Sequence, residues 1–257
     1  MKSAGDPDQY GIVIDPRYCG PPRSGNGGYV SGKFAAFVDS RDGLASDGVA
    51  PEGAVEVTLR SPPPLGVRLS VAMADGELQL RSPQTLVAQA RTSAITAAPP
   101  SAVAFDEALA AAERYAGRRN HPFPTCFVCG LDRAADDGMR LQPGAVSDST
   151  VAAAWQPHES LVIGDSTLGP EFAWAALDCP GGWAAGLEGR PMVLGRMTAR
   201  VLAAPETGRR YAIVGELRGL DGRKAFTATA LYADDGELLA HAEATWLTVD
   251  PSSVRPQ

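Results

Sequence analysis

The sequence is poor in lysine, which supplies only three of its 23 basic residues (Lys2, Lys33 and Lys224). We attribute this scarcity to compositional bias of the genome. The 30 acidic residues give a formal net charge of −7, which argues against nucleic acid or an anionic membrane as the main partner. No stretch approaches the roughly 20 apolar residues that a membrane span requires.

Cysteine is also scarce, and four cysteines in 257 residues do not make a disulfide framework. The first eight residues are polar and acidic and lack the apolar core of a signal peptide. We therefore expect a cytoplasmic protein with reduced cysteines. Its length permits one large domain or two of ordinary size.

Two catalytic motifs are missing as well. The chain has no Gly-rich phosphate loop and no Gly-x-Ser-x-Gly nucleophile elbow. The sequence thus gives no support for a P-loop nucleotide-binding protein or a serine hydrolase of the α/β type.

The second half of the chain reads as a strand, a helix and four more strands. A strand is expected at 149–155, with Val151, Ala153 and Trp155 on one face, and a helix at 169–185, with Pro170 at its first position. Hairpin turns at Asp221-Gly222 and Asp235-Gly236 separate the last three of four strands, expected at 197–203, 211–218, 224–232 and 238–249.

The first half repeats this order more faintly. It predicts a strand at 12–15, a helix at 28–39 and four strands at 55–60, 67–73, 77–81 and 85–95. Because a repeated order of elements is informative even at low identity, we interpret the chain as a duplication. The domains expected are residues 1–100 and 121–257, joined by a linker helix within 101–120.

The start of the second half carries a recognisable motif. Cys126-Phe127-Val128-Cys129-Gly130 is followed by Asp137-Gly138-Met139-Arg140-Leu141, and Asp235-Gly236 leads into the last strand. These features resemble the phenylacetyl-CoA thioesterase-like branch of the hotdog superfamily, over about residues 120–250. The resemblance implies an α+β fold, a double hotdog in which each of two antiparallel sheets wraps around a central helix.

The resemblance also implies where thioester chemistry would take place. Family members carry His-Gly-Gly at the start of the central helix, where a backbone N–H polarises the carbonyl, and an acid seven residues after the second glycine. In the second half Asp178 stands at the acid position, but Gly169-Pro170-Glu171 replaces the donor motif. In the first half Asn26-Gly27-Gly28 resembles the donor motif, and Ala35 stands at the acid position.

We infer one composite site from these complementary losses, since paired hotdogs build each site across their interface. Asp178 and Asn26 are the candidate catalytic residues, with Asp178 as general base or nucleophile and the Gly28 N–H as donor. Gly27, Gly28, Tyr29 and Trp174 are the candidate substrate-binding residues.

Each of these residues also has a structural interpretation. Asp178 could be a solvated or capping carboxylate, because Pro180 limits how far its helix can continue. Trp174 and Trp183 fit a helix core better than a ligand stack. Tyr29 could be a pocket wall or packing, and Glu171 fits an acid placed favourably in a first helical turn.

Cys126 and Cys129 could form half of a zinc site, which would need two more ligands from His121, His158, His241 and Cys179. We favour a buried turn of small thiols and expect no metal and no other cofactor. The expected function is hydrolysis of acyl-CoA or acyl-carrier-protein thioesters, by a monomer or homodimer. The alternatives are a non-catalytic acyl-CoA-binding module and an enoyl-thioester hydratase or dehydratase, although the Asp-x₄-His pattern of hotdog hydratases is missing.

Overall fold

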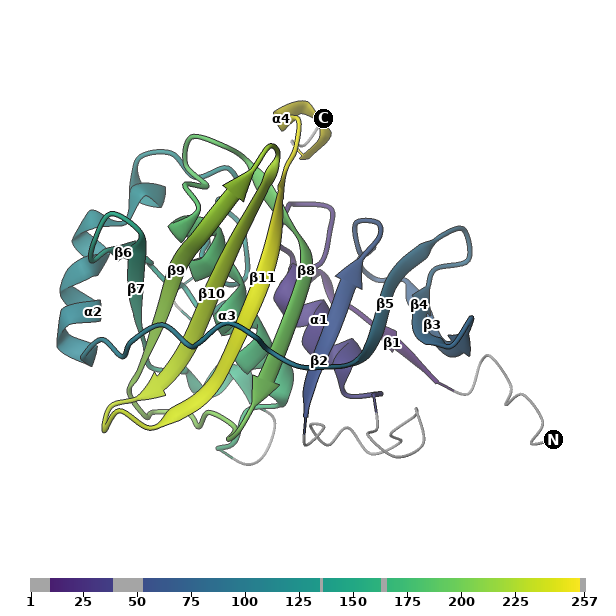
Figure 1. Cartoon of the computed structure of the whole chain (residues 1–257), viewed down its shortest axis with the longest axis horizontal. Coiled ribbons are helices and arrows are strands. Elements are labelled where there is room, and N and C mark those ends of the chain that lie inside the picture. Colours follow the sequence, from purple (N-terminus) through teal and green to yellow (C-terminus); the bar gives the residue numbers. More distant parts are fainter. Residues whose placement is uncertain (1–9, 39–52, 135, 163–165, 255–257) are drawn as a thin grey trace.

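A computed structural model describes residues 10–38, 53–134, 136–162 and 166–254. Their strands form a single antiparallel sheet in the order β1-β3-β4-β5-β2-β8-β11-β10-β9-β7-β6 (Figure 1). The strands of the first half are β1 (Gly11–Val13), β2 (Ala54–Leu59), β3 (Arg68–Ala74), β4 (Glu77–Arg81) and β5 (Leu86–Ser93). Those of the second half are β6 (Gly144–Ala145), β7 (Thr150–Trp155), β8 (Met192–Val201), β9 (Tyr211–Asp221), β10 (Lys224–Ala233) and β11 (Leu238–Thr248).

The two halves of the sheet have the same topology. The first reads β1-β3-β4-β5-β2, and the second reads β7-β9-β10-β11-β8 from its outer edge inward, with β6 added beyond β7. In each half a helix follows the first strand: α1 (Gly27–Ala35) after β1 and α3 (Pro170–Ala184) after β7. The repeated order expected from the sequence is therefore present in the structure.

The strands form where side chains alternate between a buried and a more exposed face. Val151, Ala153 and Trp155 of β7 all lie in the main core, as their spacing predicts. The turn between β3 and β4 places Asp75 and Gly76 at φ +53° and +77°, the left-handed geometry that a two-residue hairpin requires.

The halves join where β2 pairs with β8. The pairing is antiparallel, and it sets Val57 opposite Met197. Both of these side chains are fully buried. The sheet therefore runs through the junction without an open edge, and each half completes the hydrogen bonding of the other.

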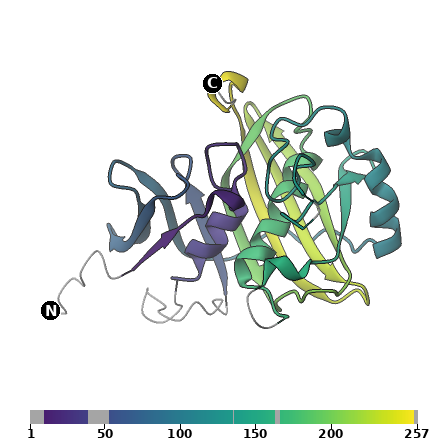
Figure 2. The ribbon, with the colours of Figure 1, turned by 180° about the vertical axis from the view of Figure 1, so that it is seen from behind.

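Helices α1 and α3 lie side by side against the same face of the sheet, as the view from behind shows (Figure 2). Gly28 of α1 faces Asp178 and Trp174, whereas Gly32 faces Glu171, so the two helices run antiparallel. A Cβ on Gly28 would lie 2.5 Å from Asp178 Cβ, and one on Gly32 would lie 2.6 Å from Glu171 Cα. The glycines therefore permit a helix–helix approach that larger residues would prevent.

The segment that joins the halves contains a helix within the expected range 101–120, and a stretch without helix precedes it. Residues 94–104 are not helical and cross the sheet on the face opposite α1 and α3, where Arg218 donates to the Ala98 carbonyl and Tyr232 to the Pro100 carbonyl (Figure 1). Helix α2 (Phe105–Ala111) follows and ends before three-residue 3₁₀ turns at Ala112–Arg114 and Ala116–Arg118. Because Ala108 packs on Ala152 and Ala212, α2 covers the second half rather than bridging the two.

One helix boundary differs from expectation. Helix α1 ends at Ala35 rather than at residue 39, which lies outside the described residues. Helix α3 spans Pro170–Ala184, in agreement with the helix expected at 169–185, and it continues past Pro180. A Cβ on Gly215 of β9 would lie 2.4 Å from the Pro180 carbonyl oxygen, so the sheet packs tightly against the turn that contains Pro180. This tertiary packing outweighs the hydrogen bond that proline cannot make.

In the described part of the chain, no helix combines the length and the apolar character needed to cross a membrane.

Candidate functional site

The N-terminus of α1 forms one side of the candidate site. Asn26 is the N-cap, and its Oδ1 accepts a hydrogen bond from the Tyr29 N–H at 2.9 Å. This bond is the usual reason for asparagine at a helix start, where the first N–H groups have no partner within the helix. The cap leaves the Asn26 Nδ2 group and the Gly28 N–H free to act as donors toward α3.

Asp178 of α3 receives both of these donors. Asn26 Nδ2 donates to Asp178 Oδ2 at 2.8 Å, and the Gly28 N–H donates to the same oxygen at 2.9 Å. The acid from the second half and the helix start from the first half therefore meet directly. The alternative of a solvated carboxylate at Asp178 does not hold, because the residue is only 3% exposed, and the N–H group that it binds belongs to the first turn of α1 rather than to its own helix.

Burial makes Asp178 an unusual carboxyl group. Desolvation raises the pKa of Asp178 to about 7, against the opposing effect of the hydrogen bonds from Gly28 and Asn26. Among the described residues Asp178 Oδ1 has no hydrogen-bond partner. One carboxyl oxygen is thus held in place by two donors, while the other is buried without a hydrogen-bond partner in the described part of the chain.

The site lies in the wall of a cavity of about 430 Å³. Asn26 and Gly27 of the first half line it together with Asp178 of the second half. Much of the remaining wall is apolar and comes from both halves, through Leu59, Phe123, Leu187, Met192, Leu194 and Trp246. A mostly apolar cavity with a few convergent polar groups is typical of a binding site for a small molecule.

The pseudosymmetric position on the other side of the helix pair is closed. It is lined by Ala35, which stands at the acid position of the first half, and by Pro170 at the start of α3. The space there is about 10 Å³, too small to hold a ligand. The complementary loss of motifs in the sequence thus corresponds to one open cavity and one closed position.

The structure does not support two of the expected substrate-binding residues. Tyr29 is buried and stacks on Tyr18, with ring centroids 4.0 Å apart, in an aromatic cluster with Phe127 and Phe172. Trp174 is buried beside Gly32, in the contact between the two helices. Neither residue is among those that line the 430 Å³ cavity, so both belong to the packing.

Of the other expected substrate-binding residues, one lies at the cavity and one acts at the start of α1. Gly27 lines the cavity, and Gly28 contributes its N–H to Asp178. Glu171 does not join Asp178, since it forms an ion pair with Lys33 at 3.4 Å across the two helices.

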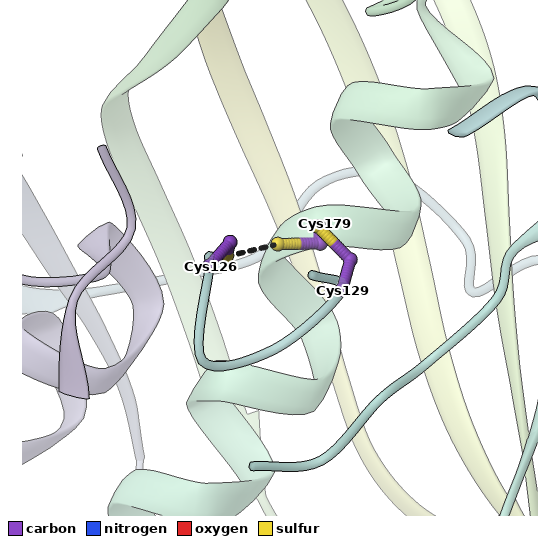
Figure 3. A group of neighbouring side chains, drawn as sticks. All are labelled: Cys126, Cys129 and Cys179. Atoms are coloured by element: carbon purple, nitrogen blue, oxygen red, sulfur yellow. Dashed lines mark hydrogen bonds between the residues drawn. The ribbon is translucent and has the colours of Figure 1, made fainter. Parts of the chain in front are cut away.

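A group of three thiols lies beside Asp178. Cys126, Cys129 and Cys179 are buried, and their sulfur atoms lie within 4.8 Å of one another (Figure 3). Cys179 follows Asp178 on α3, while the other two belong to the loop that packs against this helix (Figure 3). The sequence offered Cys179 as one of four candidate partners for the Cys-x-x-Cys pair, but its spacing did not single it out, because it lies 50 residues farther along the chain.

Neither a protein-family model nor a curated protein sequence matches this chain. Solved structures do match over nearly its whole length. A candidate thioesterase from Novosphingobium aromaticivorans has a TM-score of 0.63 at 15% identity, over 96% of this chain and 97% of that one.

A conserved protein of unknown function with the hot dog fold, from Alicyclobacillus acidocaldarius, gives a TM-score of 0.60 at 14% identity, with 98% of this chain and 95% of that chain covered. The tesB protein of Mycobacterium avium subspecies paratuberculosis gives 0.57 at 12% identity, over 88% of each chain. At such identities the likeness shows the fold alone, and that fold is the α+β hotdog.

Proposed function

Starting from the hotdog fold, we propose that this chain hydrolyses acyl thioesters, such as acyl-CoA or acyl-carrier-protein thioesters, at one composite site. In this proposal the chain is a double hotdog with units at residues 1–100 and 121–257. The proposal rests on one observation: Asp178 accepts hydrogen bonds from Asn26 and Gly28 at the wall of a cavity that both halves line. The predicted location is the cytoplasm.

The proposed chemistry uses the two sides of the site in different ways. Asp178 acts as general base or as nucleophile toward the thioester carbonyl. As a base it accepts a proton from a water molecule that adds to the carbonyl carbon; the C–S bond then breaks, and a carboxylic acid and a thiol leave. The N-terminus of α1 stabilises the developing negative charge on the carbonyl oxygen, through the helix dipole and a hydrogen bond from Asn26 Nδ2 or the Gly28 N–H.

The donors are engaged before substrate arrives. Both Asn26 Nδ2 and the Gly28 N–H bind Asp178 Oδ2, so a carbonyl oxygen must take one of these donors away from the carboxyl group. In the proposed sequence of events this exchange frees Asp178 Oδ2 as the substrate oxygen becomes held. The mainly apolar cavity accommodates the acyl chain.

The experiment is a turnover assay on a panel of acyl-CoA esters of different chain length, with the released thiol as the readout. Binding of the same esters is measured by thermal shift. We expect thiol release from at least one ester. Binding without turnover would contradict hydrolysis and favour an acyl-CoA-binding module. Loss of enoyl-CoA absorbance without thiol release would favour a hydratase.

A further inference from the structure

The three thiols beside Asp178 are arranged as metal ligands are. Cys126 Sγ and Cys179 Sγ lie 3.8 Å apart, and all three sulfur atoms fall within 4.8 Å of one another (Figure 3). Two thiolates bound 2.3 Å from a tetrahedral zinc ion lie about 3.8 Å apart. A disulfide would require a separation near 2.05 Å. The spacing of the sulfur atoms is therefore close to that of a metal site, and the three side chains need to move little to bind a metal ion.

The loop around Cys126 is a tight turn, in which the Gly130 N–H donates to the Cys126 carbonyl at 2.8 Å. The turn needs glycine at residue 130, because a Cβ there would lie 2.4 Å from the Pro124 carbonyl oxygen. The Cys-x-x-Cys-Gly sequence thus builds a fixed loop with two sulfur atoms on the same side.

Side-chain donors add to this environment. Asn26 Nδ2 lies 3.9 Å from both Cys126 Sγ and Cys179 Sγ. The Asn26 amide therefore offers N–H groups to two of the three sulfur atoms, and such donors stabilise a negatively charged sulfur.

The fourth coordination position would face the cavity. All three cysteines line it, together with Asp178. The nearby His121 is engaged elsewhere, since its Nε2 lies 3.1 Å from the Cys129 carbonyl oxygen and its Nδ1 accepts from the Phe123 N–H. Three protein ligands and one open position are the arrangement that zinc adopts where it meets small molecules.

We propose that Cys126, Cys129 and Cys179 bind one Zn²⁺ ion through three thiolates, with the fourth position open to the cavity. Thiolates are soft ligands that favour zinc over magnesium, calcium or manganese. The fourth ligand is then water or a donor atom of the cavity's occupant. This site does not depend on the proposed hydrolysis, since a zinc ion can be bound whether or not a thioester is turned over.

The first test is the metal content of tag-free protein, purified without chelators, measured by inductively coupled plasma mass spectrometry. We expect about one zinc per chain in the wild type and a loss of most of it in Cys126→Ser and in Cys179→Ser. Cys19→Ser is the matched control, because Cys19 is also buried and free but is not part of the three-sulfur group. Equal zinc in all four proteins would overturn the proposal.

A second test uses only the wild-type protein, so its outcome does not depend on whether a variant folds. The reduced wild-type protein is stripped with a chelator and titrated with Co²⁺ in the absence of oxygen. We expect the thiolate-to-cobalt charge-transfer absorption to saturate at about one equivalent and to disappear when Zn²⁺ is added. No absorption from a fully reduced protein, or a Cys126–Cys179 disulfide in the purified wild type, would contradict the zinc site.

Discussion

At the scale of single residues, the site depends on the hydrogen bonds that one buried carboxyl group receives. Asp178 is removed from water, and within the described part of the chain its hydrogen bonds come from Asn26 and Gly28 at the start of the other helix. A buried carboxyl group without donors is strongly disfavoured, so these two bonds also hold the halves together. The same few atoms thus serve both the proposed catalysis and the stability of the fold.

Replacement of Asn26 by alanine tests this dependence. The change removes the cap on the Tyr29 N–H and one donor to Asp178. We expect the free energy of unfolding to fall by about 2 to 4 kcal/mol, the sum of a lost cap and an unsatisfied buried group. Urea denaturation followed by circular dichroism measures it.

Asp15→Ala provides the control for Asn26→Ala, because Asp15 also caps a helix but is exposed. Its loss should cost less than about 1 kcal/mol. If the two variants lost equal stability, the bond between Asn26 and Asp178 would add nothing to the free energy of unfolding beyond an ordinary helix cap.

At the scale of elements, the decisive contact is the one between α1 and α3. Gly28 and Gly32 lie one turn apart on the face of α1 that meets α3, and a Cβ on either would come within 2.8 Å of an atom of α3. The close approach brings the Gly28 N–H within hydrogen-bond distance of Asp178. The glycine pair therefore sets the distance between the donor and the acid.

A Gly28→Ala substitution should force the helices apart. The new Cβ would lie 2.5 Å from the Trp174 carbonyl oxygen, which is backbone and cannot rotate away. We expect a loss of about 1 to 3 kcal/mol in the free energy of unfolding, the usual cost of overpacking. Gly189→Ala, where a Cβ meets no atom within 4 Å, is the control and should change stability by less than about 0.5 kcal/mol. Equal effects would show that the helix spacing is not tight.

Most elements could be predicted from the sequence because local signals agree with the fold. Alternating side chains and Asp-Gly turns identify the strands from β7 to β11 within a few residues. Helices α2 and α3 also lie within the ranges expected for them. The path of residues 94–104 across the sheet could not be predicted this way, since it depends on contacts with Arg218 and Tyr232. Such contacts leave no local pattern.

The site was predictable only in part for the same reason. A helix register related Asp178 to Gly28, and the structure brings the two together. Tyr29 and Trp174 lie outside the cavity lining, because proximity to Gly28 in sequence or to Asp178 on a helix does not decide which face a side chain occupies. The Cys-x-x-Cys pair suggested two of the three thiols, but only the tertiary fold shows that Cys179 joins them.

At the scale of the whole molecule, the two halves share one sheet and several buried polar contacts, among them the bonds of Asn26 and Gly28 to Asp178. Val57 and Met197 pair at the seam between them, and both are fully buried. All four tryptophans (Trp155, Trp174, Trp183 and Trp246) lie in the second half. Tryptophan fluorescence therefore reports on the second half, whereas far-ultraviolet circular dichroism reports on both.

We expect the unfolding transitions seen by these two probes to coincide in urea. Separation of the halves would expose the edges of β2 and β8 and leave Asp178 without donors, so neither half should persist alone. A fluorescence midpoint that clearly exceeds the circular dichroism midpoint would indicate that the second half folds independently, and it would contradict this shared stability.

The central claim, that Asp178 performs thioester chemistry at a site built by both halves, is tested most directly by the turnover of Asp178→Asn. This change keeps the size of the side chain and removes its ability to act as a base or nucleophile. Glu171→Gln is the matched control, since it alters a carboxylate of the same helix that pairs with Lys33 and lies outside the cavity lining.

Both variants are measured as folded proteins with the best acyl-CoA ester of the wild type. The account predicts that kcat of Asp178→Asn falls by at least about 100-fold, the lower range of a lost acid–base group, while Glu171→Gln stays within about twofold of wild type. A folded Asp178→Asn protein that hydrolyses the ester at the wild-type rate would contradict it.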